Sequence, residues 1–249
     1  MAHKFSRSRG AEPSAPGPRS PLSRPSLTSR LARLPRRVFL APVLPRPRLR
    51  RLVHLMVGLH LYGAGCALLM AAHLGSMPWD VLHQGLARIT GLSVGACMIL
   101  VGAAVMLLWI PLRQRPGVGT LSNVLLVGVW TDLWLRWLPE PEALPVRCLM
   151  LALGILAIAG ATALYIGARL GPGPRDGLMV GLTERLPVSL RVARTVIEVA
   201  VVAAGVLLGG TLGVGTVLFA VVIGPLTQVL MPLGAVPAPA PAPERSPAP

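Results

Sequence analysis

Two stretches of the chain share one pattern of glycine, proline and aspartate. The second is GPGPRDGLMVGL, from Gly171 to Leu182, and the first is GSMPWDVLHQGL, from Gly75 to Leu86, which lies 96 residues earlier. The same offset aligns the GVGT of residues 117–120 with the GVGT of residues 213–216. A single register held across most of each half indicates a duplicated unit, and an internal duplication constrains the whole fold.

Long apolar stretches recur in both units. Apolar residues make up 53% of the chain, and the mean hydropathy is +0.65. A helix needs about 20 mainly apolar residues to cross a bilayer. We therefore predict an all-α polytopic membrane protein whose two units each supply three transmembrane helices. The predicted spans are Leu52–Leu74, Leu92–Ile110 and Val118–Leu138 in the first unit, and Cys148–Leu170, Leu190–Leu208 and Val214–Leu233 in the second.

Each unit also contains a segment that is too short to span, Pro78–Thr90 and Pro174–Leu186. Both segments begin with proline and carry an aspartate two residues later, Asp80 or Asp176, a pattern typical of the first turn of a helix. We predict two short amphipathic or re-entrant helices. Backbone that enters a membrane without crossing it must be covered by protein or water.

Composition divides the chain into a membrane domain and two tails. Residues 1–50 are rich in Ser, Pro and Arg and are expected to be disordered and cytoplasmic. Residues 51–234 form the membrane domain, with repeats at about 52–138 and 148–233. Residues 235–249 are rich in Ala and Pro and are expected to be extended.

The distribution of Lys and Arg predicts the orientation. Thirteen of the 24 basic residues precede Leu52, and with both termini in the cytoplasm the cytoplasmic side receives 21 against 3 outside. Cytoplasmic loops of membrane proteins carry this excess. Because three spans per unit is an odd number, the second unit is expected to enter the plasma membrane upside down relative to the first, as an inverted repeat.

Several strings in both units are similar to those of a known family. PWDVLHQGL, GVGTL, GPGPRDGLMVGL, RVARTVIEV and LLGGTLGVGT resemble the YczE-like integral membrane proteins, relatives of the YitT group. The resemblance covers roughly Leu52 to Leu233, and its most specific part is the block from Gly171 to Met179 followed by RTVIE. It implies membrane location and a polytopic fold more than any chemistry.

The fifth predicted span carries the sharpest polar signal. Arg191, Arg194, Thr195 and Glu198 follow helical spacing and share one face. Ionisable groups inside a span are costly and usually face a bundle interior or a cavity. The equivalent positions of the first unit carry no charge. The stripe is interpreted either as a functional site or as an interhelical clamp in which Arg194 neutralises Glu198.

The aspartates of the two short helices are the second candidates. Asp80 and Asp176, with Arg175 beside the latter, are either helix-start carboxylates near free N–H groups or pseudo-symmetric groups that line a substrate path. Asp132 in the third span is interpreted as an interface residue.

The remaining motifs point away from catalysis. The three cysteines and the histidines lack the spacing of a disulfide framework or zinc site. GVGTL lacks the GK[ST] ending of a phosphate loop, and no Ser-His-Asp order is present. We therefore expect no metal, no cofactor and no enzyme activity. The basic tail has almost no aromatic residues to stack on bases, so no nucleic-acid partner is expected.

Two functions are consistent with this sequence. The first is a secondary transporter or permease for a small molecule, since inverted repeats with short helices are a recurring transporter plan. The second is a non-transporting scaffold or accessory protein that binds a partner through its charged fifth helix. In both cases the lipid bilayer is a partner, and a homo-oligomer is compatible with the sequence.

Overall fold

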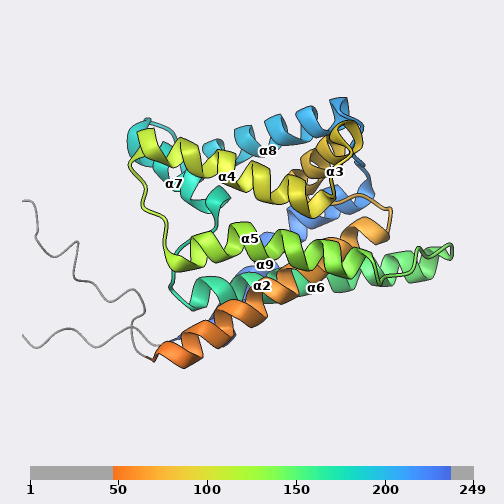
Figure 1. Cartoon of the computed structure of the whole chain (residues 1–249), viewed down its shortest axis with the longest axis horizontal. Helices are drawn as coiled ribbons and strands as arrows, with labels where there is room; N and C mark the ends of the chain where they lie inside the picture. Colours follow the sequence, from red (N-terminus) through yellow and green to blue (C-terminus); the bar gives the residue numbers. More distant parts are fainter. Residues whose placement is uncertain (1–46, 237–249) are drawn as a thin grey trace, which may run out of the picture. The chain divides into compact units, whose positions relative to one another are not determined.

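A computed structural model describes residues 47–236, and within them the chain forms eight α-helices and no strand (Figure 1). The first half contains α2 (Arg48–Ala71), α3 (Pro78–Thr90), α4 (Val94–Leu112) and α5 (Val118–Leu135). The second contains α6 (Leu144–Gly167), α7 (Pro174–Arg185), α8 (Leu190–Leu207) and α9 (Val214–Gly234). Each helix of the second half begins 96 residues after its counterpart in the first. The two short helices begin at Pro78 and Pro174, which confirms their predicted starts.

Within residues 47–236, five helices are long and apolar enough to cross a membrane: α2, α4, α5, α6 and α9. The sixth predicted span, α8, is helical but carries Arg191, Arg194 and Glu198 along its length. Large apolar side chains are exposed on the outer helices, among them Leu107 on α4 and Val221 on α9. An apolar exterior of this extent is the surface that lipid tails cover. Membrane crossing by α8 remains a prediction.

The long helices α2 and α6 run antiparallel and form the centre of the fold. Close approach is possible because Gly58 of α2 meets the backbone of α6, and Gly154 of α6 meets α2. Helix α5 packs against α2 and α9 against α6. In Figure 1, α3 and α7 lie at opposite ends of α4 and α8. Each short helix packs against a helix of the other half, α3 on α8 and α7 on α4.

Two arginines extend the central helices beyond their predicted starts. Helix α2 begins at Arg48, inside the segment expected to be a disordered tail, and α6 begins at Leu144 rather than Cys148. The Nη1 of Arg51 donates to the carbonyl of Ala168 at 2.8 Å, and the Nε of Arg147 donates to the carbonyl of Ala72 at 2.7 Å. A cation at a helix C-terminus is favourable, so each first turn is stabilised by the end of the opposite helix.

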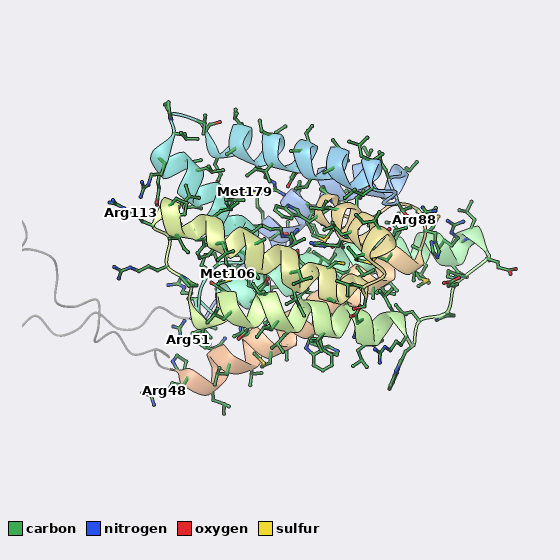
Figure 2. The ribbon with its side chains drawn as sticks, turned by 45° about the horizontal axis from the view of Figure 1, so that its top comes forward. Arg48, Arg51, Arg88, Met106, Arg113 and Met179 are labelled. Carbon is green, nitrogen blue, oxygen red and sulfur yellow. The ribbon has the colours of Figure 1, made fainter. Side chains whose placement is uncertain are left out.

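The rest of both predicted tails, residues 1–46 and 237–249, lies outside the described residues. Figure 2 shows the side chains of the described helices, with Arg48 and Arg51 at the start of α2 and Arg113 and Arg88 toward opposite ends of the helices.

The two GVGT motifs connect the halves. The amide of Gly119 donates to the carbonyl of Leu170 at 2.8 Å, and the amide of Gly215 donates to the carbonyl of Leu74 at 2.7 Å. Gly117 also lies against Leu170, where a Cβ atom would collide with the carbonyl oxygen. The start of α5 is therefore anchored to the turn before α7, and the start of α9 to the turn before α3.

Candidate functional site

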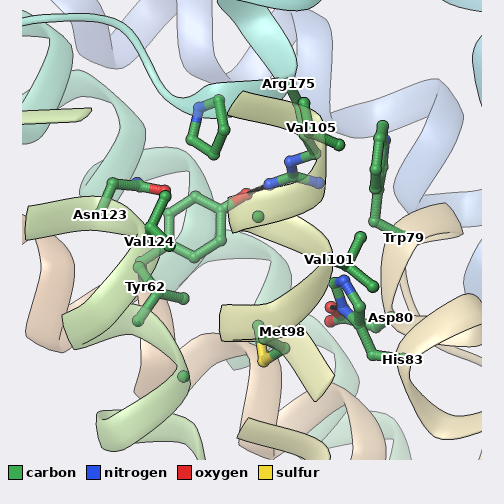
Figure 3. A pocket seen from close by; sticks show the side chains of 14 residues that line it. Tyr62, Trp79, Asp80, His83, Met98, Val101, Val105, Asn123, Val124 and Arg175 are labelled. Carbon is green, nitrogen blue, oxygen red and sulfur yellow. Dashed lines mark hydrogen bonds and ion pairs between the residues drawn. The ribbon is translucent and has the colours of Figure 1, made fainter. Parts of the chain in front are cut away.

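The first turns of α3 and α7 meet in the interior. Trp79 and Arg175 occupy equivalent positions of the two halves, and the Arg175 guanidinium carbon lies 5.7 Å from the centre of the Trp79 ring. The same carbon lies 5.8 Å from the centre of the Tyr62 ring, and Nη2 of Arg175 donates to the Tyr62 hydroxyl (Figure 3). A cation within about 6 Å of an aromatic face is attracted by the ring quadrupole. We call Tyr62, Trp79 and Arg175 the arginine layer.

The two aspartates bond to side chains and do not cap their own helices. Both lie in the first turn, as predicted, but neither α3 nor α7 has a side-chain hydrogen bond at its N-cap. Oδ2 of Asp176 accepts a 2.8 Å hydrogen bond from the hydroxyl of Tyr165. Oδ1 of Asp80 lies 3.3 Å from Nδ1 of His83. Asp80 is completely buried, and its Oδ2 has no partner among the described residues.

Three of the predicted site residues, Asp80, Arg175 and Asp176, lie close together, and the side chains that bond to Arg175 and Asp176 were not predicted from the sequence. The chain has only two tyrosines, Tyr62 and Tyr165, and each bonds to one of the charged groups of α7. The equivalent positions of the other half are Ile158 and Leu69, so the tyrosines interrupt the repeat. The sequence did contain one signal for these partners: each tyrosine lies in an apolar helix and corresponds to an aliphatic residue in the other half.

The surroundings of Arg175 keep its charge. Burial lowers the pKa of the guanidinium. The nearby Tyr62, Asp176 and Asp80 raise this pKa by more than burial lowers it, so the net direction is upward. A charged group held by aromatic faces and carboxylates at the start of α7 can therefore act as a fixed cation.

The arginine layer lies on the wall of two cavities. The larger, of about 320 Å³, is also lined by Tyr165, Asp176 and residues of α8 and α9, including Arg194, Glu198 and Gly224. The smaller, of about 50 Å³, is lined by Asp80, His83 and residues of α4 and α5, including Met98, Gly102 and Gly128. These last three residues are the 96-residue equivalents of Arg194, Glu198 and Gly224. The two cavities thus occupy corresponding places in the two halves.

Only part of the predicted α8 stripe reaches a cavity. Nε of Arg194 pairs with Oε1 of Glu198 at 2.9 Å, and both side chains line the larger cavity with exposed fractions of 50% and 26%. Arg191 and Thr195 are exposed and are not among the lining residues. The predicted ion pair is confirmed, and the stripe divides into a cavity-facing pair and two outer residues.

The two helices beside the smaller cavity are joined by contacts that the equivalent helices beside the larger cavity lack. The carboxylate of Asp132 on α5 accepts from the Ser93 hydroxyl at 2.5 Å and from the Gly95 amide at 2.7 Å, which confirms Asp132 as an interface residue. Gly128 of α5 packs against the backbone of Gly95, whereas a Cβ atom on its equivalent, Gly224 of α9, would meet open space. Helices α4 and α5 are therefore tightly joined beside the small cavity, and α8 and α9 are separated beside the large one.

Within residues 47–236, no three side chains of His, Cys, Asp or Glu converge as metal ligands do. The chemistry that this site offers is recognition by charge and hydrogen bonding, from two guanidinium groups, two carboxylates and two tyrosine hydroxyls around one cavity.

Apolar helices with an exposed hydrophobic surface, arranged around a charged interior, define an α-helical multi-pass membrane protein. A model of the family described as "Family of unknown function (DUF6198)" matches residues 49–232. The chain belongs to this family of YczE-like membrane proteins.

Relatives of the chain come from two bacteria. An "Uncharacterized protein" of Haemophilus influenzae is 40% identical over 198 residues, which cover 80% of this chain and 91% of the relative. The "Uncharacterized membrane protein YczE" of Bacillus subtilis is 32% identical over 160 residues, which cover 64% of this chain and 74% of the relative. The "Uncharacterized protein YyaS" of Bacillus subtilis is 25% identical over 181 residues, 71% of this chain and 90% of the relative. No solved structure matches the chain.

Proposed function

We propose that the protein is a secondary transporter of the plasma membrane that moves a small molecule through the centre of the fold without chemical conversion. The observation that carries this proposal is the pair of corresponding cavities, one of about 320 Å³ and one of about 50 Å³, that share the arginine layer. A volume of 300–1,000 Å³ is typical of small-molecule sites.

The proposal includes an inverted repeat of six transmembrane helices. It is supported by the 96-residue offset between the helix starts of the two halves. It is also supported by contacts between the halves that occur twice, at equivalent residues. Arg51 and Arg147 each bond to the carbonyl at the end of the opposite central helix, and Gly119 and Gly215 each bond to the turn of the opposite half. Transporters built from inverted repeats bind substrate where the repeats meet, often at helix N-termini.

Alternating access follows from the difference between the two cavities. Helices α8 and α9 are apart beside Gly224, and helices α4 and α5 are joined through Asp132 and Gly128. If α8 and α9 join while α4 and α5 separate, the large cavity shrinks and the small one grows. A solute bound at the arginine layer then passes from one side of the membrane to the other. Packed elements with two discrete arrangements are the usual basis of such a switch.

The lining of the larger cavity favours a small zwitterionic substrate. Arg175 and Arg194 supply positive charge, and Asp176 and Glu198 supply negative charge, so the formal charges of these four side chains cancel. A molecule with one cationic and one anionic group finds a charged partner for each of them. Apolar walls from Ile158, Phe219 and Ile223 leave room for a short hydrocarbon part.

The orientation is proposed from charge. Both termini are placed in the cytoplasm, because that arrangement gives 21 basic residues inside against 3 outside. Single cysteines introduced at residues 140–146 should react with an impermeant reagent from outside, and those at residues 171–187 only from inside. Equal accessibility of the two loops would contradict the inverted repeat.

The test of transport begins with the purified protein and a panel of zwitterionic metabolites in a thermal-shift assay. A ligand at about 100 times its Kd stabilises a protein by about 2.7 kcal/mol. Gly224→Trp places a ring in the larger cavity, so this variant should remain folded and lose the ligand-induced shift. Val221→Trp, on the exposed face of the same helix, should retain it.

Ligands found in this way are then assayed for uptake into proteoliposomes. The proposal expects uptake by the wild type and by Val221→Trp, and loss of uptake by Gly224→Trp. Uptake that is unaffected by Gly224→Trp would contradict a path through this cavity.

A membrane scaffold is the second candidate, and one observation favours it. Arg191 and Thr195 lie outside the cavity lining on α8, beside the exposed apolar residues Val192 and Val196, so a partner helix has a surface to pack on. Substitutions of these outer residues would then abolish function, while Gly224→Trp would not. If the protein is a transporter, Gly224→Trp should abolish function and substitutions of Arg191 and Thr195 should not.

A further inference from the structure

We infer that the small cavity is a proton-binding site, in which Oδ2 of Asp80 takes up the proton and His83 orients the carboxylate. Asp80 and His83 line this cavity, and Asp80 is completely buried. Its Oδ1 faces Nδ1 of His83, and its Oδ2 has no hydrogen-bond partner among the described residues. A buried carboxylate oxygen without a donor is costly, and addition of a proton removes the charge that makes it so.

A second buried side chain, with a polar atom that is unpartnered within residues 47–236, lines the same cavity. Trp79, whose Nε1 also has no partner in the described part of the chain, lines the same space as Asp80. One donor and one acceptor thus border a cavity of about 50 Å³, which is room for about one or two water molecules. Water in this space would pass on a proton from hydronium: one O–H bond of the hydronium breaks and leaves neutral water, one O–H bond forms at Oδ2, and the carboxylate becomes a neutral acid.

The comparison with the other half shows that this arrangement is not required by the fold. The equivalent of Asp80 is Asp176, whose Oδ2 is occupied by the Tyr165 hydroxyl, and the equivalent of His83 is Met179. One half therefore holds an aspartate beside a tyrosine hydroxyl, and the other holds an aspartate beside a histidine, with its second carboxylate oxygen buried and without a donor among the described residues. Chains of Asp, Glu and His inside a membrane mark proton relays.

The charged and titratable groups that face Asp80 define what its protonation changes. Arg175 of α7 acts on it across the arginine layer, Tyr62 and Cys66 approach from α2, and His83 lies on its own helix. The lining residues from α4 and α5, such as Met98 and Asn123, carry no charge.

Neutralisation of Asp80 removes one of the negative charges that hold Arg175 between the two cavities. Proton binding would thereby favour movement of the arginine layer. This coupling rests on the proposed transport function, whereas proton binding at Asp80 does not.

Infrared difference spectroscopy of the purified full-length protein during a pH titration tests the site directly, with the proton as the only probe. The wild type should show the carboxylic-acid band of a buried group on acidification, with a frequency shift in D₂O. Asp80→Asn should lose this band, and Asp80→Glu should retain it at a shifted frequency. Asp176→Asn, the change at the equivalent position, should leave it in place.

Two further variants test the surroundings. Arg175→Gln should leave the band present, because the Asp80 carboxyl is unchanged. His83→Gln should leave the band present and change its frequency, because it replaces the partner of Oδ1. Loss of the band in Asp176→Asn, its persistence in Asp80→Asn or its absence from the wild type would overturn the inference. Because no transported substrate is used, failure here is distinguishable from failure of the transport assay.

Discussion

Arg194 and Glu198 pair on the wall of a cavity and keep part of their surface exposed. Removal of one member of a fully buried pair costs about 3–5 kcal/mol, but an exposed pair contributes only about 0–1 kcal/mol. Glu198→Gln alone should therefore lower the free energy of unfolding by less than about 1 kcal/mol. The double variant Arg194→Met with Glu198→Gln should fold normally and lose substrate-dependent activity. A double variant that is stable and shows full uptake would contradict a role of this pair in transport and leave it with a structural role only.

Arg147 stabilises the end of α2 through two carbonyls. Its Nε donates to Ala72 at 2.7 Å and its Nη2 donates to His73 at 2.6 Å. Hydrogen bonds to charged groups contribute about 1.5–3 kcal/mol. Arg147→Met should reduce the free energy of unfolding by about that amount, measured by thermal or denaturant unfolding in detergent. Arg136→Met, at an exposed position, is the control and should change stability by no more than about 0.5 kcal/mol.

At the scale of helices, one glycine position should respond in opposite ways in the two halves. In Gly128→Ala the new methyl group collides with the backbone of Gly95, and overpacking of this kind costs about 1–3 kcal/mol. In Gly224→Ala the methyl group enters open space, and the higher helix propensity of alanine stabilises α9 by up to about 1 kcal/mol. Unfolding of the two variants under identical conditions measures the difference. Equal destabilisation would show that α8 and α9 are packed as tightly as α4 and α5.

Helix positions could be predicted from sequence because their causes are local. Proline at the first turn marks Pro78 and Pro174, and apolar length marks the spans. The starts of α2 and α6 were placed too late, because Arg51 and Arg147 are stabilised by carbonyls more than 70 residues away. Their equivalence at the 96-residue offset was nevertheless visible in the sequence.

The candidate site could be predicted only in part, for a related reason. The charges Asp80, Arg175 and Asp176 stood out in an apolar chain, but their partners Tyr62 and Tyr165 lie inside long apolar helices. Helical spacing places residues on one face and gives no information about which helix lies opposite. The cavity depends on the separation of α8 from α9, which neither sequence segment specifies alone.

For the whole molecule, alternating access predicts a contact that forms only in the second arrangement. Ser93 and Asp132 are hydrogen-bonded at 2.5 Å, while their equivalents, Ser189 and Gln228, share no hydrogen bond in the described part of the chain. In a Cys148→Ser background, the pair Ser189→Cys and Gln228→Cys should form a disulfide slowly, faster with substrate, and should then stop uptake. The control pair Ser93→Cys and Asp132→Cys should cross-link at once. Equally fast cross-linking of both pairs would contradict two arrangements.

The hydrogen bonds that each GVGT motif forms with the opposite half bear on how a duplicated chain of this kind can evolve. The amide of Gly119 donates to the carbonyl of Leu170 and that of Gly215 to the carbonyl of Leu74, so each half supplies an acceptor for one backbone amide of the other. Under the proposed inverted repeat, a protein with a single unit would need a second copy inserted in the opposite direction. In such a dimer every substitution appears twice. In one chain the two copies can differ, and they do so beside the aspartates, where His83 of the first half corresponds to Met179 of the second.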